Sequence, residues 1–172
     1  MTYRIVTVCT GNICRSPLAE YALREAFAEA GLGEAVEITS VGTSGWEIGN
    51  PIDPRAGDLL RRHGIDAHQH RARQMADDEV RDADLVLALD HDHVGPLERA
   101  LGAQAARKTV RMVRDFAPTP VEDTGIRDPW YGDEGDFEIA WEQITEATDR
   151  IVEHVRAALT SRERQDSPKE QR

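Results

Sequence analysis

Two cysteines and an arginine lie close together near the start of this 172-residue chain. Cys9 and Arg15 are separated by five residues, and Cys14 directly precedes the arginine. A thiolate is a strong nucleophile, and the planar guanidinium of arginine can bind two oxygens of one phosphate group. The pattern therefore indicates covalent chemistry on a compact oxyanion, with Cys9 attacking and Arg15 holding the oxygens.

The residues around the cysteines predict a strand, a short loop and a helix. Residues 4–8 are largely β-branched and predict a strand that ends at Cys9. Ser16 followed by Pro17 predicts the N-cap and the first residue of a helix. The backbone N–H groups of such a loop, together with the helix N-terminus, form a site for an anion.

An ordinary thiol is only a few per cent ionised at neutral pH, so this loop must stabilise a thiolate. Gly11 and Asn12 can adopt positive φ and turn N–H groups inward, while the Ser16 hydroxyl and the Arg15 charge add to the effect. The alternative is that both cysteines are small buried hydrophobic residues. The position of Cys9 between a strand and a helix favours the nucleophile. The glycine patterns of nucleotide-binding loops are absent from this turn.

Alternating strand and helix patterns continue along the chain. The further strands are predicted at 36–41, 85–89 and 109–113, and the further helices at about 53–64, 75–81, 94–101 and 137–159. The third strand has no polar face and should be central in a sheet covered on both sides. We predict an α/β fold, a single-domain doubly wound sheet of four to five parallel strands with helices on both faces. The domain should span residues 1–160, with residues 161–172 forming a disordered polar tail.

Composition limits the possible partners. With 21 basic and 32 acidic residues the net charge is −11, which argues against nucleic acid or anionic lipid as the main partner. No apolar run approaches the roughly 18 residues of a membrane span, and the N-terminal residues lack a signal-peptide pattern. Two cysteines make no disulfide framework. We expect a cytoplasmic protein that binds neither nucleic acid nor membrane.

Five segments together resemble the low-molecular-weight protein tyrosine phosphatases. They are Val8–Pro17, Ser40–Trp46, Gly49–Arg55, His70–Gln74 and Asp128–Gly132. They follow the family's order and spacing across most of the chain. The resemblance implies a protein-tyrosine-phosphatase that hydrolyses phosphotyrosine and small aryl phosphate monoesters through a phosphocysteine intermediate. It implies no metal and no other cofactor.

The resemblance also implies a role for each site residue. Cys9 is the nucleophile, Arg15 clamps the phosphate, and Asp128 acts first as general acid and then as general base. The phosphate-binding residues are Thr10, Gly11, Asn12, Ile13, Cys14 and Arg15. Those that support the loop are Asn12, Ser16, Ser40 and His70.

For Asp128 and three aromatic residues, the local sequence also allows a purely structural role. An Asp before Pro is a common turn residue, so Asp128 alone does not indicate catalysis. Trp46, Trp130 and Tyr131 all lie in predicted loops. They either anchor those loops in the core or form the walls of a substrate pocket deep enough to favour phosphotyrosine over the shorter phosphoserine. Phe137 and Trp141, on the last helix, are assigned to the core.

The same residues allow other interpretations. The histidine pairs at 68/70 and 91/93 superficially resemble metal ligands, but we predict no metal site. Cys14 could trap an oxidised Cys9 as a reversible disulfide; a Cys14→Ser variant that recovers from peroxide as well as wild type would contradict this. An arsenate reductase would need cysteines beyond Cys14, and a phosphocysteine carrier would lack Arg15 and Asp128. The presence of Cys9, Arg15 and Asp128 together argues against a catalytically silent phosphotyrosine-binding module.

The resemblance also indicates a class of partners. The resemblance implies phosphotyrosine-containing proteins, and a cognate bacterial tyrosine kinase is one candidate. We expect a monomer, and weak dimerisation stays open.

Overall fold

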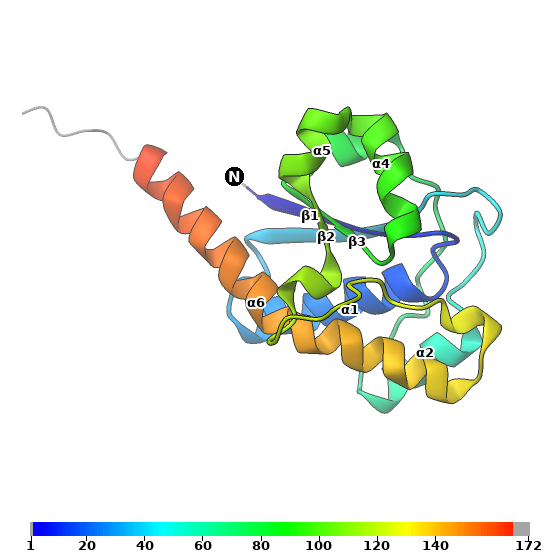
Figure 1. Cartoon of the computed structure of the whole chain (residues 1–172). Coiled ribbons are helices and arrows are strands. Elements are labelled where there is room, and N and C mark those ends of the chain that lie inside the picture. Colours follow the sequence, from blue (N-terminus) through cyan, green and yellow to red (C-terminus); the bar gives the residue numbers. More distant parts are fainter. Residues whose placement is uncertain (1, 167–172) are drawn as a thin grey trace, which may run out of the picture.

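A four-stranded parallel sheet with the order β2-β1-β3-β4 forms the centre of the molecule, and helices cover both of its faces (Figure 1). The structure is a computed structural model that describes residues 2–166. Its strands are β1 (Tyr3–Cys9), β2 (Val36–Gly42), β3 (Leu85–Ala88) and β4 (Val110–Met112). Its helices are α1 (Arg15–Glu29), α2 (Pro54–Arg62), α3 (Asp77–Arg81), α4 (Val94–Leu101), α5 (Ala103–Thr109) and α6 (Glu134–Asp166). The predicted fold is confirmed, with four strands.

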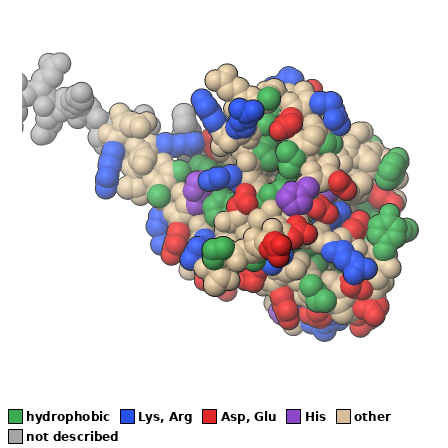
Figure 2. Space-filling model, viewed as in Figure 1, with side chains coloured by type: hydrophobic (Ala, Val, Ile, Leu, Met, Phe, Trp, Pro, Cys, Tyr) green, Lys and Arg blue, Asp and Glu red, His purple; other side chains and the backbone are tan. Residues whose placement is uncertain are grey.

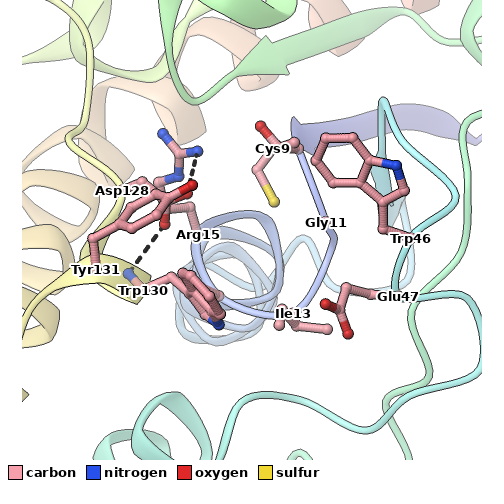
Figure 3. A pocket seen from close by; sticks show the side chains of 11 residues that line it. Cys9, Gly11, Ile13, Arg15, Trp46, Glu47, Asp128, Trp130 and Tyr131 are labelled. Atoms are coloured by element: carbon pink, nitrogen blue, oxygen red, sulfur yellow. Dashed lines mark hydrogen bonds and ion pairs between the residues drawn. The ribbon is translucent and has the colours of Figure 1, made fainter.

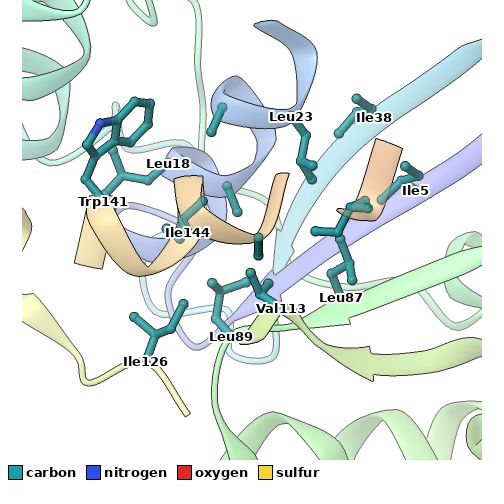
Figure 4. Close-up of a cluster of buried hydrophobic side chains, with 14 of the residues drawn as sticks. Ile5, Leu18, Leu23, Ile38, Leu87, Leu89, Val113, Ile126, Trp141 and Ile144 are labelled. Atoms are coloured by element: carbon teal, nitrogen blue, oxygen red, sulfur yellow. The ribbon is translucent and has the colours of Figure 1, made fainter. Parts of the chain in front are cut away.

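Two hydrophobic cores lie on opposite faces of the sheet because side chains alternate along each strand. Ile5 and Leu87 point into the core that packs against α1, α2 and α6 (Figure 4). Val6, which follows Ile5, and Val86, which precedes Leu87, point into the second core, beneath α3 and α4. Every residue of β3 is buried, so the prediction of a central strand covered on both sides is confirmed.

The loops that follow β1, β2 and β3 meet at one edge of the sheet, because parallel strands end on the same side. Cys9 at the end of β1 pairs with Gly42 at the end of β2. A Cβ atom on Gly42 would lie 2.6 Å from the Thr10 carbonyl oxygen, so only glycine allows these two loops to approach. This edge is where α/β folds of this type bind ligands.

The start of α1 differs from its prediction. The helix begins at Arg15 with Cys14 as N-cap, and no side chain caps it. Ser16 is therefore not the N-cap, because its hydroxyl bonds to residues of the preceding loop instead. The start of α2 does follow the prediction, since the Asp53 carboxylate caps it by accepting the N–H of Arg55 at 2.9 Å.

Helix α6 is the longest helix among the described residues, and it extends beyond the predicted domain boundary. Phe137 and Trp141 on this helix are buried, which confirms their assignment to the core. Residues 161–166, expected in the disordered tail, continue the helix. Arg162 anchors this end, because it pairs with Asp84 at 2.6 Å and lies over the Tyr3 ring at 4.9 Å. Residues 167–172 of the expected tail lie outside the described residues.

Four further elements were not predicted. Helix α5 fills a segment to which no element was assigned, and short 3-10 turns lie at His91–His93, at Val113–Phe116 and, within the long loop before α6, at Pro129–Tyr131. Acidic and basic side chains are interspersed on the face seen in Figure 2. Within residues 2–166, no helix combines the length and the apolarity that crossing a membrane requires.

Candidate active site

A cavity of about 260 Å³ opens above the loop that follows β1 (Figure 3). Trp46 stands on one side of the Cys9 sulfur, and Trp130 and Tyr131 stand on the other. Arg15 and Asp128 also line the cavity. The structure thus brings together the three residues predicted to be catalytic and the three predicted to form the pocket walls, from segments far apart in the sequence.

The cysteine loop, residues 9–15, directs backbone N–H groups into this cavity. Its carbonyl groups point away and are bound elsewhere: Ser44 N to Thr10 O (3.0 Å), His70 Nε2 to Asn12 O (2.7 Å) and Asp53 N to Ile13 O (2.9 Å). The peptide bonds are trans, so the N–H of each peptide points opposite to its carbonyl. The N–H groups of Gly11, Ile13 and Cys14 therefore face the cavity, where they can bind an anion.

Asn12 holds the loop in shape from below. It is fully buried and has a φ of 60°, so of the two residues predicted to permit positive φ, Asn12 uses it. Its Nδ2 donates to Ser16 Oγ and to Ser40 Oγ, each at 2.9 Å, and its Oδ1 accepts the N–H of Arg73 at 2.9 Å. One carboxamide therefore links the loop to α1, to β2 and to the segment that precedes α3.

His70 belongs to the same support network. Because its Nε2 binds a carbonyl oxygen, the Asn12 carbonyl, that nitrogen must carry a proton. Burial lowers the pKa of His70 below its ordinary value, while the hydrogen bond to Asn12 opposes this shift. Glu20 extends the network, because its buried carboxylate accepts the Ser40 hydroxyl proton. Glu20 was not predicted, and its place one turn after Ser16 on α1 was the available signal.

The Cys9 sulfur lies at the floor of the cavity within reach of two donors. The N–H of Asn12 donates to the sulfur at 3.3 Å, and Ser16 Oγ lies 3.0 Å away. Ser16 Oγ accepts a proton from Asn12, and its own hydroxyl proton has two acceptors within reach, the sulfur and the Val41 carbonyl oxygen at 3.3 Å. Donors so placed stabilise a thiolate over a thiol.

Cys14 is the second cysteine of the loop. Its side chain is buried, and burial, followed by the negative charge of Asp53, raises the pKa of its thiol well above the ordinary range. Cys14 therefore stays protonated at neutral pH, although it lines the same cavity.

Arg15 is held in a fixed position beneath one wall. Its Nη1 donates to the Ile126 carbonyl at 2.8 Å and lies 3.4 Å from Asp90 Oδ2. Its Nη2 lies 3.3 Å from Asp128 Oδ2. Asp90 was not predicted as a site residue, although it follows β3 at the sheet edge where ligands bind, which was a usable signal.

Asp128 has two roles in the geometry. Its Oδ1 caps the 3-10 turn by accepting the N–H of Trp130 at 3.1 Å, while Oδ2 faces Arg15. The common function of Asp before Pro in a turn thus coincides with a place in the site. The turn presents the Trp130 and Tyr131 rings, which contact edge to face with their centroids 5.0 Å apart.

Arg55 fixes this turn to α2 and was also missed. Its guanidinium binds Asp53 through two nitrogens, at 3.1 and 2.9 Å. The same group donates to the carbonyls of Trp130 (3.3 Å) and Gly132 (3.0 Å). The aromatic wall therefore has a defined position relative to the helix behind it.

The histidine pairs do not converge on a common point. Their contacts are His68 with Asp66, His70 with Asn12, His91 with Asp123 and His93 with Thr10. In the part of the chain that the structure describes, no three His, Cys, Asp or Glu side chains are grouped so that they could hold a metal ion.

Comparison with known proteins identifies the family. The family model described as low molecular weight phosphotyrosine protein phosphatase matches residues 4–161. The chain belongs to this family. The predicted resemblance is thereby confirmed.

Relatives agree with this assignment. The low molecular weight protein-tyrosine phosphatase A of Mycobacterium tuberculosis is 44% identical over 144 residues, which is 83% of this chain and 85% of that protein. The crystal structure of YfkJ from Bacillus subtilis has a TM-score of 0.84 at 29% identity and covers 92% of this chain and 97% of its own. The YwlE arginine phosphatase, solved as a Cys-to-Ser mutant with a phosphorylated active-site serine, has a TM-score of 0.77 at 25% identity, covering 89% and 95%.

Proposed function

We propose that this member of the phosphotyrosine phosphatase family hydrolyses phosphotyrosine monoesters through a phosphocysteine intermediate. The observation that carries the proposal is the convergence of Cys9, Arg15 and Asp128 in one cavity, with backbone N–H groups facing the same space. A nucleophile, a fixed cation and a carboxylate are the groups that phosphate monoester hydrolysis without a metal requires.

In the first step, the Cys9 thiolate attacks phosphorus and forms an S–P bond while the P–O bond to the leaving group breaks. Asp128 gives its proton to the departing tyrosyl oxygen. In the second step, a water gives a proton to Asp128 and its oxygen attacks phosphorus. The S–P bond then breaks, and inorganic phosphate and the Cys9 thiolate are released. The phosphorylated serine of the YwlE mutant supports a covalent intermediate at the equivalent place.

Arg15 and the loop N–H groups bind the three non-bridging oxygens during both steps. Arg15 Nη2 lies 3.3 Å from Asp128 Oδ2. A bound phosphate dianion shares the Arg15 guanidinium with Asp128.

The aromatic walls support an aryl substrate. Cys9 is buried at the floor, whereas Trp46 and Tyr131 stand exposed at the mouth. A phosphate group reaches the sulfur only on a side chain long enough to cross the walls, and a flat ring can pack between them. These features favour phosphotyrosine over phosphoserine, and over the flexible guanidinium chain of phosphoarginine.

The remaining parts of the proposal concern its setting. We infer that the partners are phosphotyrosine-containing proteins, with a tyrosine kinase as one candidate, and that the protein is a monomer. We place it in the cytoplasm, because a nucleophilic thiolate needs a reducing compartment.

Two variants test the proposal on the purified protein. Cys9→Ser should abolish turnover of a phosphotyrosyl peptide while the variant still binds inorganic phosphate.

Asp128→Asn should slow the hydrolysis of phenyl phosphate by roughly 10²–10⁴-fold, the range of general acid catalysis. The hydrolysis of p-nitrophenyl phosphate should slow much less, because nitrophenolate leaves without a proton. Equal losses on both esters would remove Asp128 from its role. Faster turnover of phosphoarginine than of phosphotyrosine would overturn the substrate assignment.

A further inference from the structure

His93 is a buried histidine beside the cavity that the proposed reaction does not use. It ends the short 3-10 turn His91–His93 after β3 and is 1% exposed. Both ring nitrogens have partners. Nδ1 lies 3.0 Å from the backbone N of Asp90, and Nε2 lies 3.0 Å from the Thr10 hydroxyl oxygen.

These two contacts determine where the ring carries its proton. A backbone N–H can only donate, so Nδ1 must be the unprotonated acceptor. A neutral imidazole then carries its proton on Nε2, and His93 donates that proton to the Thr10 oxygen. Burial and the nearby Arg15 charge lower the pKa of His93 to about 4, against the opposing charges of Asp92 and Asp128. The ring is therefore neutral at pH 7, in agreement with the geometry.

The consequence falls on Thr10, the first residue after the nucleophile. Its oxygen accepts the His93 proton, so its own hydroxyl proton must point in another direction. Thr10 lines the cavity. Because His93 donates to one side of the Thr10 hydroxyl oxygen, the hydroxyl acts as an oriented donor on its other side. The space it adjoins is the space that the phosphate oxygens would occupy.

The same ring also links two segments around Arg15. Through Nδ1 it binds the backbone of Asp90, whose carboxylate faces Arg15. Through Nε2 it binds the cysteine loop. A single side chain thus joins the loop after β3 to the loop after β1, with no direct contact to the cavity.

We propose that His93 is a positioning residue for the phosphatase reaction, which acts through Thr10 by turning its hydroxyl into a donor for a phosphate oxygen. The inference rests on the proposed function, since it assigns the phosphate oxygens as the acceptor. A histidine that only filled the core would stabilise the fold without affecting the reaction.

Two substitutions separate the two contacts. The amide nitrogen of glutamine can take the place of Nε2, so His93→Gln keeps the donor to Thr10. Asparagine is shorter and can keep only the acceptor for the Asp90 N–H, so His93→Asn loses the donor. We expect kcat for p-nitrophenyl phosphate to fall roughly tenfold in His93→Asn, the equivalent of one lost hydrogen bond, with a weaker affinity for inorganic phosphate. His93→Gln should recover most of both losses.

A double-mutant cycle with Thr10→Val tests the route. In the Thr10→Val background, His93→Asn should cost little more, because the hydroxyl through which it acts is already gone. The proposal would be overturned if the kcat losses of the two single variants were fully additive in the double variant. It would also be overturned if His93→Asn had the wild-type kcat at an unchanged melting temperature. Equal losses in His93→Asn and His93→Gln would overturn it as well.

A measurement without activity keeps this inference distinct from the proposed function. The ¹⁵N chemical shifts of the His93 ring in the wild-type protein at pH 7 should show a protonated Nε2 and an unprotonated Nδ1. The opposite tautomer would overturn the positioning role even in an active phosphatase. A different result is also informative: the wild-type protein binds inorganic phosphate, and His93→Asn binds it more weakly as expected, but the wild-type protein has no turnover. That result would contradict the proposed function and leave the positioning of Thr10 supported.

Discussion

At the floor of the cavity, Cys9, Asn12, Ser16 and Ser40 are each no more than 3% exposed, whereas Trp46 and Tyr131 at the rim are 84% and 80% exposed. The polar groups of the floor bind one another and the surrounding backbone, so their positions are set before a substrate arrives. At the rim, Arg55 holds the backbone of the turn that carries Tyr131, whereas the exposed Trp46 and Tyr131 side chains can change rotamer when a ligand enters. Rate should therefore depend on the floor, and the choice among substrates on the rim.

The largest expected effect comes from Arg15, where the floor meets the wall. Arg15→Lys keeps a positive charge but loses the planar fork that contacts Ile126, Asp90 and Asp128. We expect kcat/KM for p-nitrophenyl phosphate to fall roughly 10²–10³-fold, as when a donor to a developing negative charge is removed. A loss below threefold would show that charge alone is sufficient and that the fixed geometry of the floor is unimportant.

A substitution of Asn12 tests the floor, because the Asn12 side chain supports the loop and does not contact the phosphate. Asn12→Ala removes the bonds to Ser16, Ser40 and Arg73 and puts alanine at a φ of 60°. We expect a loss of roughly 2–4 kcal/mol in the free energy of unfolding, measured by urea denaturation, and roughly tenfold or more in kcat.

Asn12→Gly is the matched control, because glycine accepts the same φ without strain. It should regain part of the stability but not the activity. Wild-type activity in Asn12→Gly would contradict the role of the carboxamide in shaping the loop.

Low pH should decrease the free energy of unfolding through the two buried histidines, His93 and His70. The pKa of His93 is about 4 in the folded protein, against about 6.5 in the unfolded chain. Between these pH values the unfolded chain binds more protons, so the stabilisation is complete above pH 6.5 and is lost as the pH falls toward 4. The loss is at most about 3 kcal/mol, and His70 adds to it with the same sign.

The comparison with His93→Asn isolates this contribution. The difference in free energy of unfolding between wild type and variant should shrink as the pH is lowered from 6.5 to 4. A constant difference over that range would show that His93 does not titrate as the buried geometry requires.

The smallest effect is expected at the rim. Trp46→Ala removes one exposed wall and should change the free energy of unfolding by no more than about 0.5 kcal/mol. KM for a phosphotyrosyl peptide should rise by a few-fold with kcat nearly unchanged, because the ring binds the ground state and the transition state alike. If kcat fell as much in Trp46→Ala as in Asn12→Ala, the prediction that rate depends on the floor and not on the rim would be wrong.

The elements around Cys9 could be predicted because their signals are local. A β-branched run, residues that permit positive φ and an apolar helix stripe need no knowledge of distant segments. The same reliance on local rules explains the error at Ser16, where a Ser-Pro pair typical of an N-cap is outweighed by contacts with Cys9 and Asn12. Likewise, the composition of residues 161–166 suggests disorder, but Arg162 finds Asp84, 78 residues earlier in the chain.

Asp90 and His93 could not be connected to the site in this way. Their partners Arg15 and Thr10 lie 75 and 83 residues away along the chain, and only the pairing of β1 with β3 brings them together. The sequence does contain the histidine and aspartate cluster, but its spacing suggests metal ligands rather than a support for the cysteine loop. The resemblance to the family named the buried support residues Asn12, Ser16, Ser40 and His70, but not Asp90 or His93.

Arg55 has a further consequence for the entrance. Because one guanidinium joins the cap of α2 to the carbonyls of Trp130 and Gly132, the backbone of this wall cannot shift independently of α2. Asp128 directly precedes the same turn and caps it. A substitution that released Arg55 would therefore loosen the wall and the carboxylate together.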